Sequence, residues 1–286
     1  VAEGGRGPKD TRGQTVRYHT SAIRQRREAS AAAALGATTR PSAAVCVVGL
    51  ARTLSSPEVY RSLAANATSG ALDADASVFF LLDLERRSVA DYGEAFARVP
   101  PAALVLFNGS NSSSWGELPY CHAWSRCGPA CVQQFHKLIA CRRLVEAAEA
   151  IRGRPFDWLL RFRPDVEWLA PLGELGRLDS DAVHVVVRQS GIHDLEDNFA
   201  LVPRRFADAY FGIGESCPTD AEVRATQCVF SLADGVGHIY PECAIKSRLD
   251  QLGVRIKAFP RLYRIRREDG CQQADPRFGL TKTVKC

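Results

Sequence analysis

Residues 44–50 read AVCVVGL, a short and continuous apolar run that ends at a glycine and a leucine. A run of this kind predicts a strand buried on both faces of a sheet. Two more such runs follow, SVFFLLD at 77–83 and AALVLF at 102–107. The segments between them, 57–65 and 89–98, have the pattern of helices. An order of strand, helix, strand, helix, strand is typical of a parallel sheet with crossover helices.

The rest of the chain continues this pattern. A long amphipathic helix is predicted over 132–152. Further strands are predicted over 156–162, 182–187, 199–202 and 254–259, and further helices over 204–211, 220–232 and 242–252. We therefore expect residues 44–286 to form one α/β domain of Rossmann-like type, with a mixed, mostly parallel sheet flanked by helices. Ligands of such sheets bind beyond the carboxyl ends of the strands.

Residues 1–43 have a different composition. They are rich in Gly, Arg, Ser, Thr and Ala and show no periodic apolar pattern, which predicts a disordered basic stem. Much of the net charge of +5 comes from this stem, and the remainder of the chain is close to balanced. The charge therefore gives little support to nucleic-acid binding. No run of 18 apolar residues occurs, so we expect a membrane connection only through an N-terminal anchor that this sequence lacks.

The ten cysteines indicate the compartment. Their number is even and they do not form the tight pairs of a zinc site, so disulfides are favoured. A zinc knuckle is the alternative around Cys127-Gly-Pro-Ala-Cys131, where Cys121, His122 and His136 are close in sequence. Three glycosylation sequons begin at Asn66, Asn108 and Asn111. Together these features predict an oxidising compartment of the secretory pathway, and we expect the Golgi lumen.

The strongest chemical motif is FDWLLRFRPDVE, residues 156–167. Pro164 cannot donate to a sheet ladder, so the strand should end there and place Asp165 and Glu167 at its carboxyl edge. Two carboxylates can hold a divalent cation whose other ligands are phosphate oxygens, and Arg163 can pair with a phosphate. The alternative is a solvated strand end with an Arg–Asp ion pair. We find none of the sequence patterns of a nucleophile elbow, a HExxH zinc site, a phosphate loop or a dinucleotide fingerprint.

In the order of its motifs, the chain resembles glycosyltransferases of the GT-A fold, and most closely lumenal and capsule-type members with an R-x-R-P-D strand end. The resemblance spans most of residues 44–260 and rests on VVGLAR (47–52), QFHK (134–137), LRFRPDVE (160–167), DNFALVPR (197–204) and Pro241-Glu242. It implies a GT-A-like domain. The third segment stands in the place of the family's D-x-D, but its second acid is Glu167 rather than Asp, which leaves metal dependence open.

The resemblance implies a role for each candidate residue. Gly49, Arg52, Gln134, Lys137 and Arg163 would contact the nucleotide-sugar. Gln134 and Lys137 are expected in the first turn of their helix, where the helix dipole would add to the attraction of a diphosphate. For each of these residues, an ordinary turn or a solvated helix face is the plain alternative.

The remaining candidates concern metal binding and catalysis. Asp165, with Glu167 and His238, would hold Mn²⁺ or Mg²⁺. Asp197 would contact the donor sugar or the acceptor, and Glu242 would act as the base for an acceptor hydroxyl. A charged loop, a helix N-terminal acid and a structural histidine are the respective alternatives.

These expectations define a glycosyltransferase that moves a sugar, expected from a UDP-sugar, to a hydroxyl of a glycan or glycoconjugate. Two other classes remain open. One is a non-catalytic lumenal carbohydrate-binding protein on a degenerate transferase fold. The other is a glycoside hydrolase with Asp165 and Glu242 as paired carboxylates, which predicts a sugar cleft and no nucleotide pocket.

Overall fold

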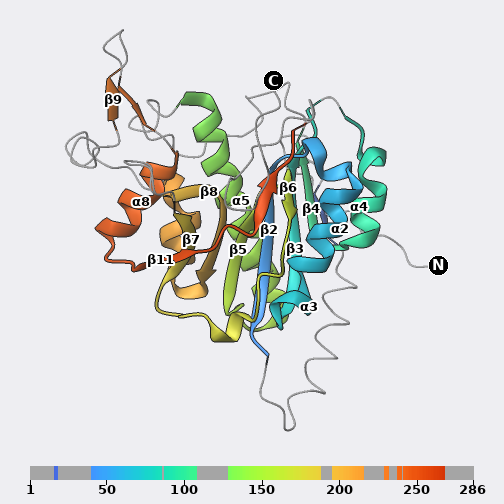
Figure 1. Ribbon diagram of the computed structural model, residues 1–286, viewed down its shortest axis with the longest axis horizontal. Helices are drawn as coiled ribbons and strands as arrows, with labels where there is room; N and C mark the ends of the chain where they lie inside the picture. Colours follow the sequence, from blue (N-terminus) through green and yellow to red (C-terminus); the bar gives the residue numbers. More distant parts are fainter. Residues whose placement is uncertain are drawn as a thin grey trace.

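The computed structural model of the protein describes residues 16–18, 40–85, 87–107, 128–187, 195–215, 229–231, 237–239 and 241–267. An eight-stranded sheet crosses the molecule in the order β1-β4-β3-β2-β5-β8-β7-β11 (Figure 1). Its strands are β1 (Val16–Tyr18), β2 (Ser42–Leu50), β3 (Asp75–Asp83), β4 (Pro101–Phe107), β5 (Trp158–Phe162), β7 (Val183–Val187), β8 (Leu195–Pro203) and β11 (Ile256–Phe259).

The sheet is mixed and mostly parallel. Strands β4, β3, β2 and β5 run parallel to one another, and β11 runs parallel to β7. Strand β8 is antiparallel to both of its neighbours, and short β1 is antiparallel to β4. The prediction of an α/β, Rossmann-like fold is confirmed.

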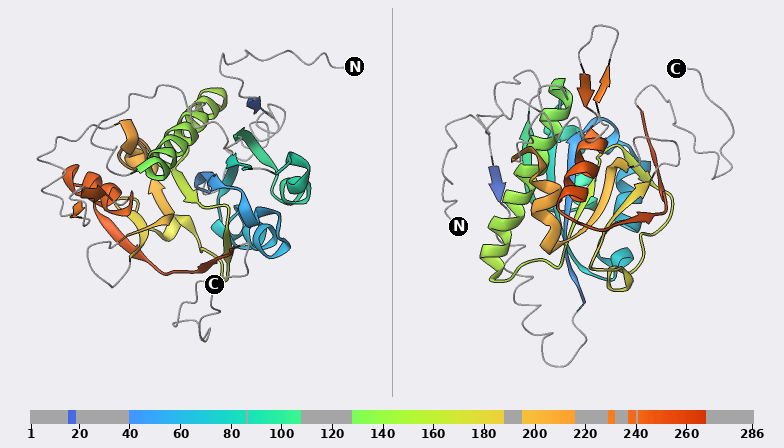
Figure 2. Two further views of the ribbon diagram at one scale, coloured as in Figure 1. Left: turned by 90° about the horizontal axis from the view of Figure 1, so that it is seen from above. Right: turned by 90° about the vertical axis from the view of Figure 1, so that its left-hand side faces the viewer.

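Helices cover both faces of the sheet, and two small ribbons complete the fold (Figure 2). The helices are α2 (Pro57–Asn66), α3 (Ser69–Leu72), α4 (Gly93–Arg98), α5 (Gly128–Arg152), α6 (Ala207–Phe211) and α8 (Pro241–Gln251). Short 3₁₀ turns lie at η1 (Arg52–Ser55), η2 (Val89–Tyr92), η5 (Leu175–Arg177), η6 (Arg204–Phe206) and η7 (Ile213–Glu215). The ribbons pair β6 (Val166–Trp168) with β12 (Tyr263–Ile265), and β9 (Val229–Ser231) with β10 (Gly237–Ile239). None of the helices within these described ranges is long and apolar enough to cross a membrane.

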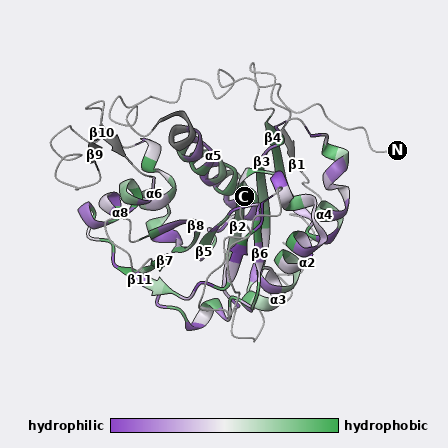
Figure 3. Cartoon of the chain, turned by 45° about the horizontal axis from the view of Figure 1, so that its top comes forward, coloured by the Kyte–Doolittle hydropathy of each residue, from purple (hydrophilic) through white to green (hydrophobic). Residues whose placement is uncertain are grey.

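The alternation of side chains along β2 explains why the strand is apolar throughout. Cys46 and Val48 pack with α5, α6 and α8 on one face, whereas Val45 and Val47 pack with α2, α3 and the β6–β12 ribbon on the other. Figure 3 shows hydrophobic segments along the central strands and mixed, amphipathic colouring on the helices around them. Each face of the sheet thus has its own apolar core.

A disulfide joins the middle of the sheet to its longest helix. Cys46 of β2 and Cys141 of α5 are bonded, both are fully buried, and 95 residues separate them in sequence. Cys243 in α8 is also disulfide-bonded. These bonds confirm the prediction that cysteines of this chain form disulfides. Most of the alternative zinc knuckle, and the sequons at Asn108 and Asn111, lie outside the described residues.

Several sequence predictions differ from the structure. The helix predicted over 220–232 is wrong at its end, because 229–231 form β9, and the rest of it lies outside the described residues. Helix α5 begins at Gly128, four residues before the predicted start at 132. Strand β8 begins at Leu195 rather than at 199. Strand β1 lies within the predicted stem, whose other parts up to residue 39 are not described.

Candidate functional site

The strand order of the sheet reverses between the parallel strands β2 and β5. From β2 the chain proceeds outward through β3 and β4, and it then returns to place β5 on the other side of β2. Crossover connections diverge at such a switch point and leave a crevice beyond the carboxyl ends of the two strands. Because β8 is antiparallel, its first residues lie at this same edge, as the pairing of Phe162 with Phe199 shows.

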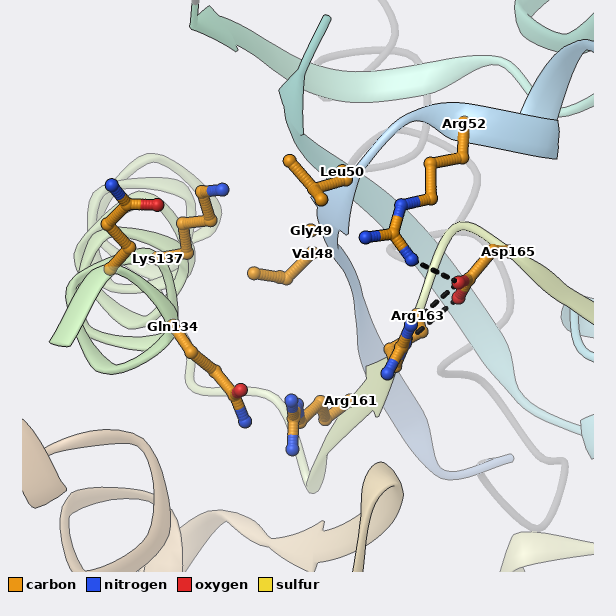
Figure 4. A pocket seen from close by; sticks show the side chains of 10 residues that line it. Val48, Gly49, Leu50, Arg52, Gln134, Lys137, Arg161, Arg163 and Asp165 are labelled. Carbon is orange, nitrogen blue, oxygen red and sulfur yellow. Dashed lines mark hydrogen bonds and ion pairs between the residues drawn. The ribbon is translucent and has the colours of Figure 1, made fainter. Parts of the chain in front are cut away.

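A pocket of about 260 Å³ lies at this edge, next to α5. Figure 4 shows Gln134 and Lys137 projecting from α5 on one side and Arg52, Arg163 and Asp165 on the other. Its lining residues come from β2 and the turn after it, from α5 and from the end of β5: Val48, Gly49, Leu50, Arg52, Gln133, Gln134, Lys137, Arg161, Arg163 and Asp165. The structure thus brings together five predicted nucleotide-site residues, Gly49, Arg52, Gln134, Lys137 and Arg163, with Asp165.

Gly49 allows the two strand ends to approach closely. Its φ of +148° is one that L side chains rarely adopt, and a Cβ at this position would lie 3.0 Å from Cδ of Pro164. Arg52, three residues on, has a φ of +28°, which is uncommon for a residue other than glycine. This backbone turns the chain sharply after β2 and presents the Arg52 side chain to the pocket.

Asp165 is engaged by two arginines. Nε and Nη2 of Arg163 donate to its two carboxylate oxygens at 2.9 and 2.6 Å, and Nη1 of Arg52 lies 3.6 Å from Oδ2. Nη1 of Arg163 also donates to Oδ1 of Asn198 at 2.9 Å. Burial opposes the charge on Arg163, but Asp165 outweighs it, so the pKa of the guanidinium lies above its ordinary value.

Glu167 is held away from this arrangement by its own pair of arginines. It lies in β6, whose pairing with β12 places it opposite Arg264. Arg264 donates to both carboxylate oxygens at 2.7 Å, and Arg266 donates to Oε2. Burial would raise the pKa of Glu167, but the hydrogen bonds from both arginines outweigh it and hold the pKa below its ordinary value.

The α5 wall carries a buried ion pair. Nζ of Lys137 lies 3.5 Å from Oδ2 of Asp83, the last residue of β3, and both side chains are buried. Burial lowers the pKa of Lys137, and Asp83 opposes that shift. The predicted contribution of the helix N-terminus is wrong, because α5 begins at Gly128 and Lys137 lies more than two turns inside it.

The floor of the pocket is a polar cluster around Arg161, which is 2% exposed. Its Nη2 lies 3.7 Å from Oδ2 of Asp197 and its Nη1 3.4 Å from the hydroxyl of Tyr210. Nε of Arg161 has no hydrogen-bond acceptor among the described residues. Gln134 donates to Oδ2 of Asp197 at 2.6 Å. A buried guanidinium with only long contacts favours a ligand that supplies acceptors.

Two candidates are not among the described residues that line the pocket. Glu242 is in the first turn of α8 and does not line the pocket, although its charge acts on Tyr210 and helps burial to raise the pKa of that phenol. The backbone of His238 is in β10, but its side chain lies outside the described part of the chain.

The described residues do not fit the predicted metal site. Where the chain is described, no group of three or more His, Cys, Asp or Glu side chains could hold an ion. Asp165 and Glu167 each face two arginines instead. A cation at either carboxylate would have to displace these positive groups. Binding of Mn²⁺ or Mg²⁺ therefore stays a prediction that this geometry does not support.

Asp83, Arg161 and Asn198 stand in segments that the sequence analysis singled out, but none of the three was predicted to be a site residue. Asp83 ends a predicted strand, so the rule of carboxyl ends could have found it. Arg161 carried a second signal, since a charged residue inside an apolar strand needs a partner or a ligand. Asn198 gave no such signal, because its place beside Arg163 depends on the antiparallel pairing of β8.

Comparison with models of known protein families found no match, and a search for curated relatives found none either.

Proposed function

We propose that this chain is a glycosyltransferase that binds a nucleotide-sugar, expected to be a UDP-sugar, and transfers the sugar to a hydroxyl of a glycan or glycoconjugate. One observation carries the proposal. The pocket at the switch point is lined by four cationic side chains, Arg52, Lys137, Arg161 and Arg163, and by one carboxylate, Asp165. Asp83 and Asp197 pair with Lys137 and Arg161 from outside the lining, and the lining itself carries more positive than negative side chains, which favours an anion.

The distribution of this charge favours an elongated ligand with one anionic end. Arg52 and Arg163 share Asp165, so the surplus charge lies beside the turn after β2. At the floor, Arg161 and Asp197 balance each other and offer both donors and an acceptor. A diphosphate suits the first region and the hydroxyls of a sugar suit the second. Charge develops on a departing diphosphate, and fixed cations at that position lower the barrier.

The resemblance in the order of the motifs adds support, as does the mixed sheet with its reversal between β2 and β5. Asp197 does not line the pocket itself, but it contacts Arg161 and Gln134, which do, and we keep its proposed role at the donor sugar. Glu242 remains the proposed base for the acceptor hydroxyl, near Tyr210 rather than in the pocket wall. We place the reaction in the secretory pathway, expected in the Golgi lumen, because the described cysteines are disulfide-bonded.

The two rival classes make different predictions. The hydrolase needs two carboxylates that flank a cleft, but Asp165 is buried under two arginines and Glu242 does not line the pocket. A carbohydrate-binding protein would bind glycans and leave nucleotide-sugars intact.

The first test is thermal stability of the full chain against a panel of nucleoside diphosphates and their sugars, all in Mn²⁺-containing buffer. A ligand that binds only the folded state adds about 3 kcal/mol of stability at one hundred times its Kd. We expect stabilisation by one nucleotide class. We also expect slow hydrolysis of the corresponding nucleotide-sugar, which releases the nucleoside diphosphate. Arg52→Ala should reduce both effects, and Arg177→Ala, at an arginine whose side chain is 79% exposed, should change neither. Stabilisation by glycans alone would contradict the proposal.

A further inference from the structure

We propose that the pocket binds the anionic group of its ligand directly on Arg52 and Arg163, with no divalent cation between the ligand and the protein. The inference rests on the proposed function, since the group concerned is the diphosphate of the donor. It goes further because two arginines, and not the metal ion that the resemblance implies, would bind and neutralise the diphosphate.

The exposure of the charged groups carries the argument. The side chain of Asp165 is 1% exposed, whereas those of Arg163 and Arg52 are 24% and 27% exposed. Asp165 lines the pocket but is almost fully buried, so a ligand that enters meets mainly the two guanidinium groups. A metal site has the opposite arrangement, with its carboxylate oxygens facing the ligand.

Arg163 is fixed in this arrangement. Two of its nitrogens donate to Asp165 and the third donates to Asn198, while its backbone N–H donates to the carbonyl of Asn198 at 3.2 Å. A cation on Asp165 would have to break the bidentate pair and move a guanidinium that β8 also holds. A guanidinium has five N–H donors and these side-chain bonds use three, so the fixed Arg163 keeps two N–H groups for phosphate oxygens.

The second carboxylate is not available either. Glu167 accepts hydrogen bonds from Arg264 and Arg266, and the backbone N–H of Arg266 donates to the carbonyl of Asp165 at 2.8 Å. The β6–β12 ribbon thus stabilises the loop of Asp165 and keeps Glu167 paired. Asp165 is then a positioning residue that orients Arg52 and Arg163 toward the ligand.

The inference is tested by calorimetric titration of the full chain with UDP and with UDP-glucose, first in EDTA and then in Mn²⁺. We expect the two Kd values for each ligand to agree within about threefold, because the contacts are direct hydrogen bonds to charged groups. Arg163→Met should weaken binding by about tenfold or more in both buffers, the loss expected for such a bond. Arg52→Met is the second variant if Arg163→Met does not fold. Arg177→Met, which removes an exposed arginine paired with Glu174, is the matched control.

The outcomes separate this inference from the proposed function. Binding that requires Mn²⁺ would overturn the inference and leave the transferase proposal intact. Binding in EDTA that both arginine variants retain would also overturn it. No binding of either ligand in either buffer would remove the donor site, and both proposals would fall together.

Discussion

The Cys46–Cys141 disulfide should contribute a large part of the stability of this domain. The double variant Cys46→Ala/Cys141→Ala removes the bond and leaves neither of its two cysteines as an unpaired thiol. The bond closes a loop with a sequence separation of 95 residues, for which the chain-entropy estimate is about 4.7 kcal/mol. The melting temperature of a domain of this size should fall by about 10 to 15 °C.

Urea unfolding of the wild type and the double variant tests this reasoning. The bond restricts the unfolded chain, so its loss should also steepen the dependence of the unfolding free energy on urea, because the unfolded chain exposes more surface. A loss of packing alone would lower the midpoint and leave that slope unchanged. The reasoning is refuted if the variant loses less than about 1 kcal/mol, or if peptide mapping finds Cys46 as a free thiol.

The disulfide should matter for ligand binding as well. Cys141 lies one helical turn after Lys137 on α5, and Cys46 lies three residues before Gly49 on β2. The bond therefore joins the two walls of the pocket. We expect the double variant, measured well below its melting temperature, to bind nucleotide more weakly than the wild type. Unchanged affinity would show that packing alone holds the two walls.

Three further predictions concern single residues. Gly49→Ala should cost about 1 to 3 kcal/mol in urea unfolding, because it adds a Cβ 3.0 Å from Pro164 at a φ of +148°, and a neutral result would show that the strand ends can move apart. Glu167→Gln should destabilise the protein by about 3 kcal/mol at pH 7. Hydrogen bonds from Arg264 and Arg266 hold the folded pKa of Glu167 below its ordinary value, so its contribution is present above that ordinary value and is lost as the pH falls through the folded one; the difference from wild type should therefore shrink in acid unfolding curves. Arg161→Met should weaken binding of a nucleotide-sugar more than binding of the free nucleoside diphosphate in calorimetry, and equal losses would place the sugar elsewhere.

Much of the fold could be predicted from the sequence because its central strands are buried on both faces. Runs such as AVCVVGL at 44–50 and SVFFLLD at 77–83 are almost entirely apolar, because helices bury both faces of these strands. Strand β9 was missed, since a three-residue strand has too few side chains to show a period. The β6–β12 ribbon was missed for the same reason, and it changed the interpretation of Glu167.

The sequence by itself determined the class of the fold, the presence of disulfides and the edge of the sheet at which the pocket lies, because burial, cysteine number and strand ends leave local patterns. It also selected Gly49, Arg52, Lys137, Arg163 and Asp165 as pocket residues. Only the tertiary structure decided which charges face the ligand, since that depends on pairs formed between distant strands and helices. The sequence Arg163-Pro164-Asp165 would read the same whether the carboxylate bound a metal ion or a guanidinium group. The packing of β5 against β2 and β8 buries Asp165 beneath the arginines and so makes the pocket surface positive.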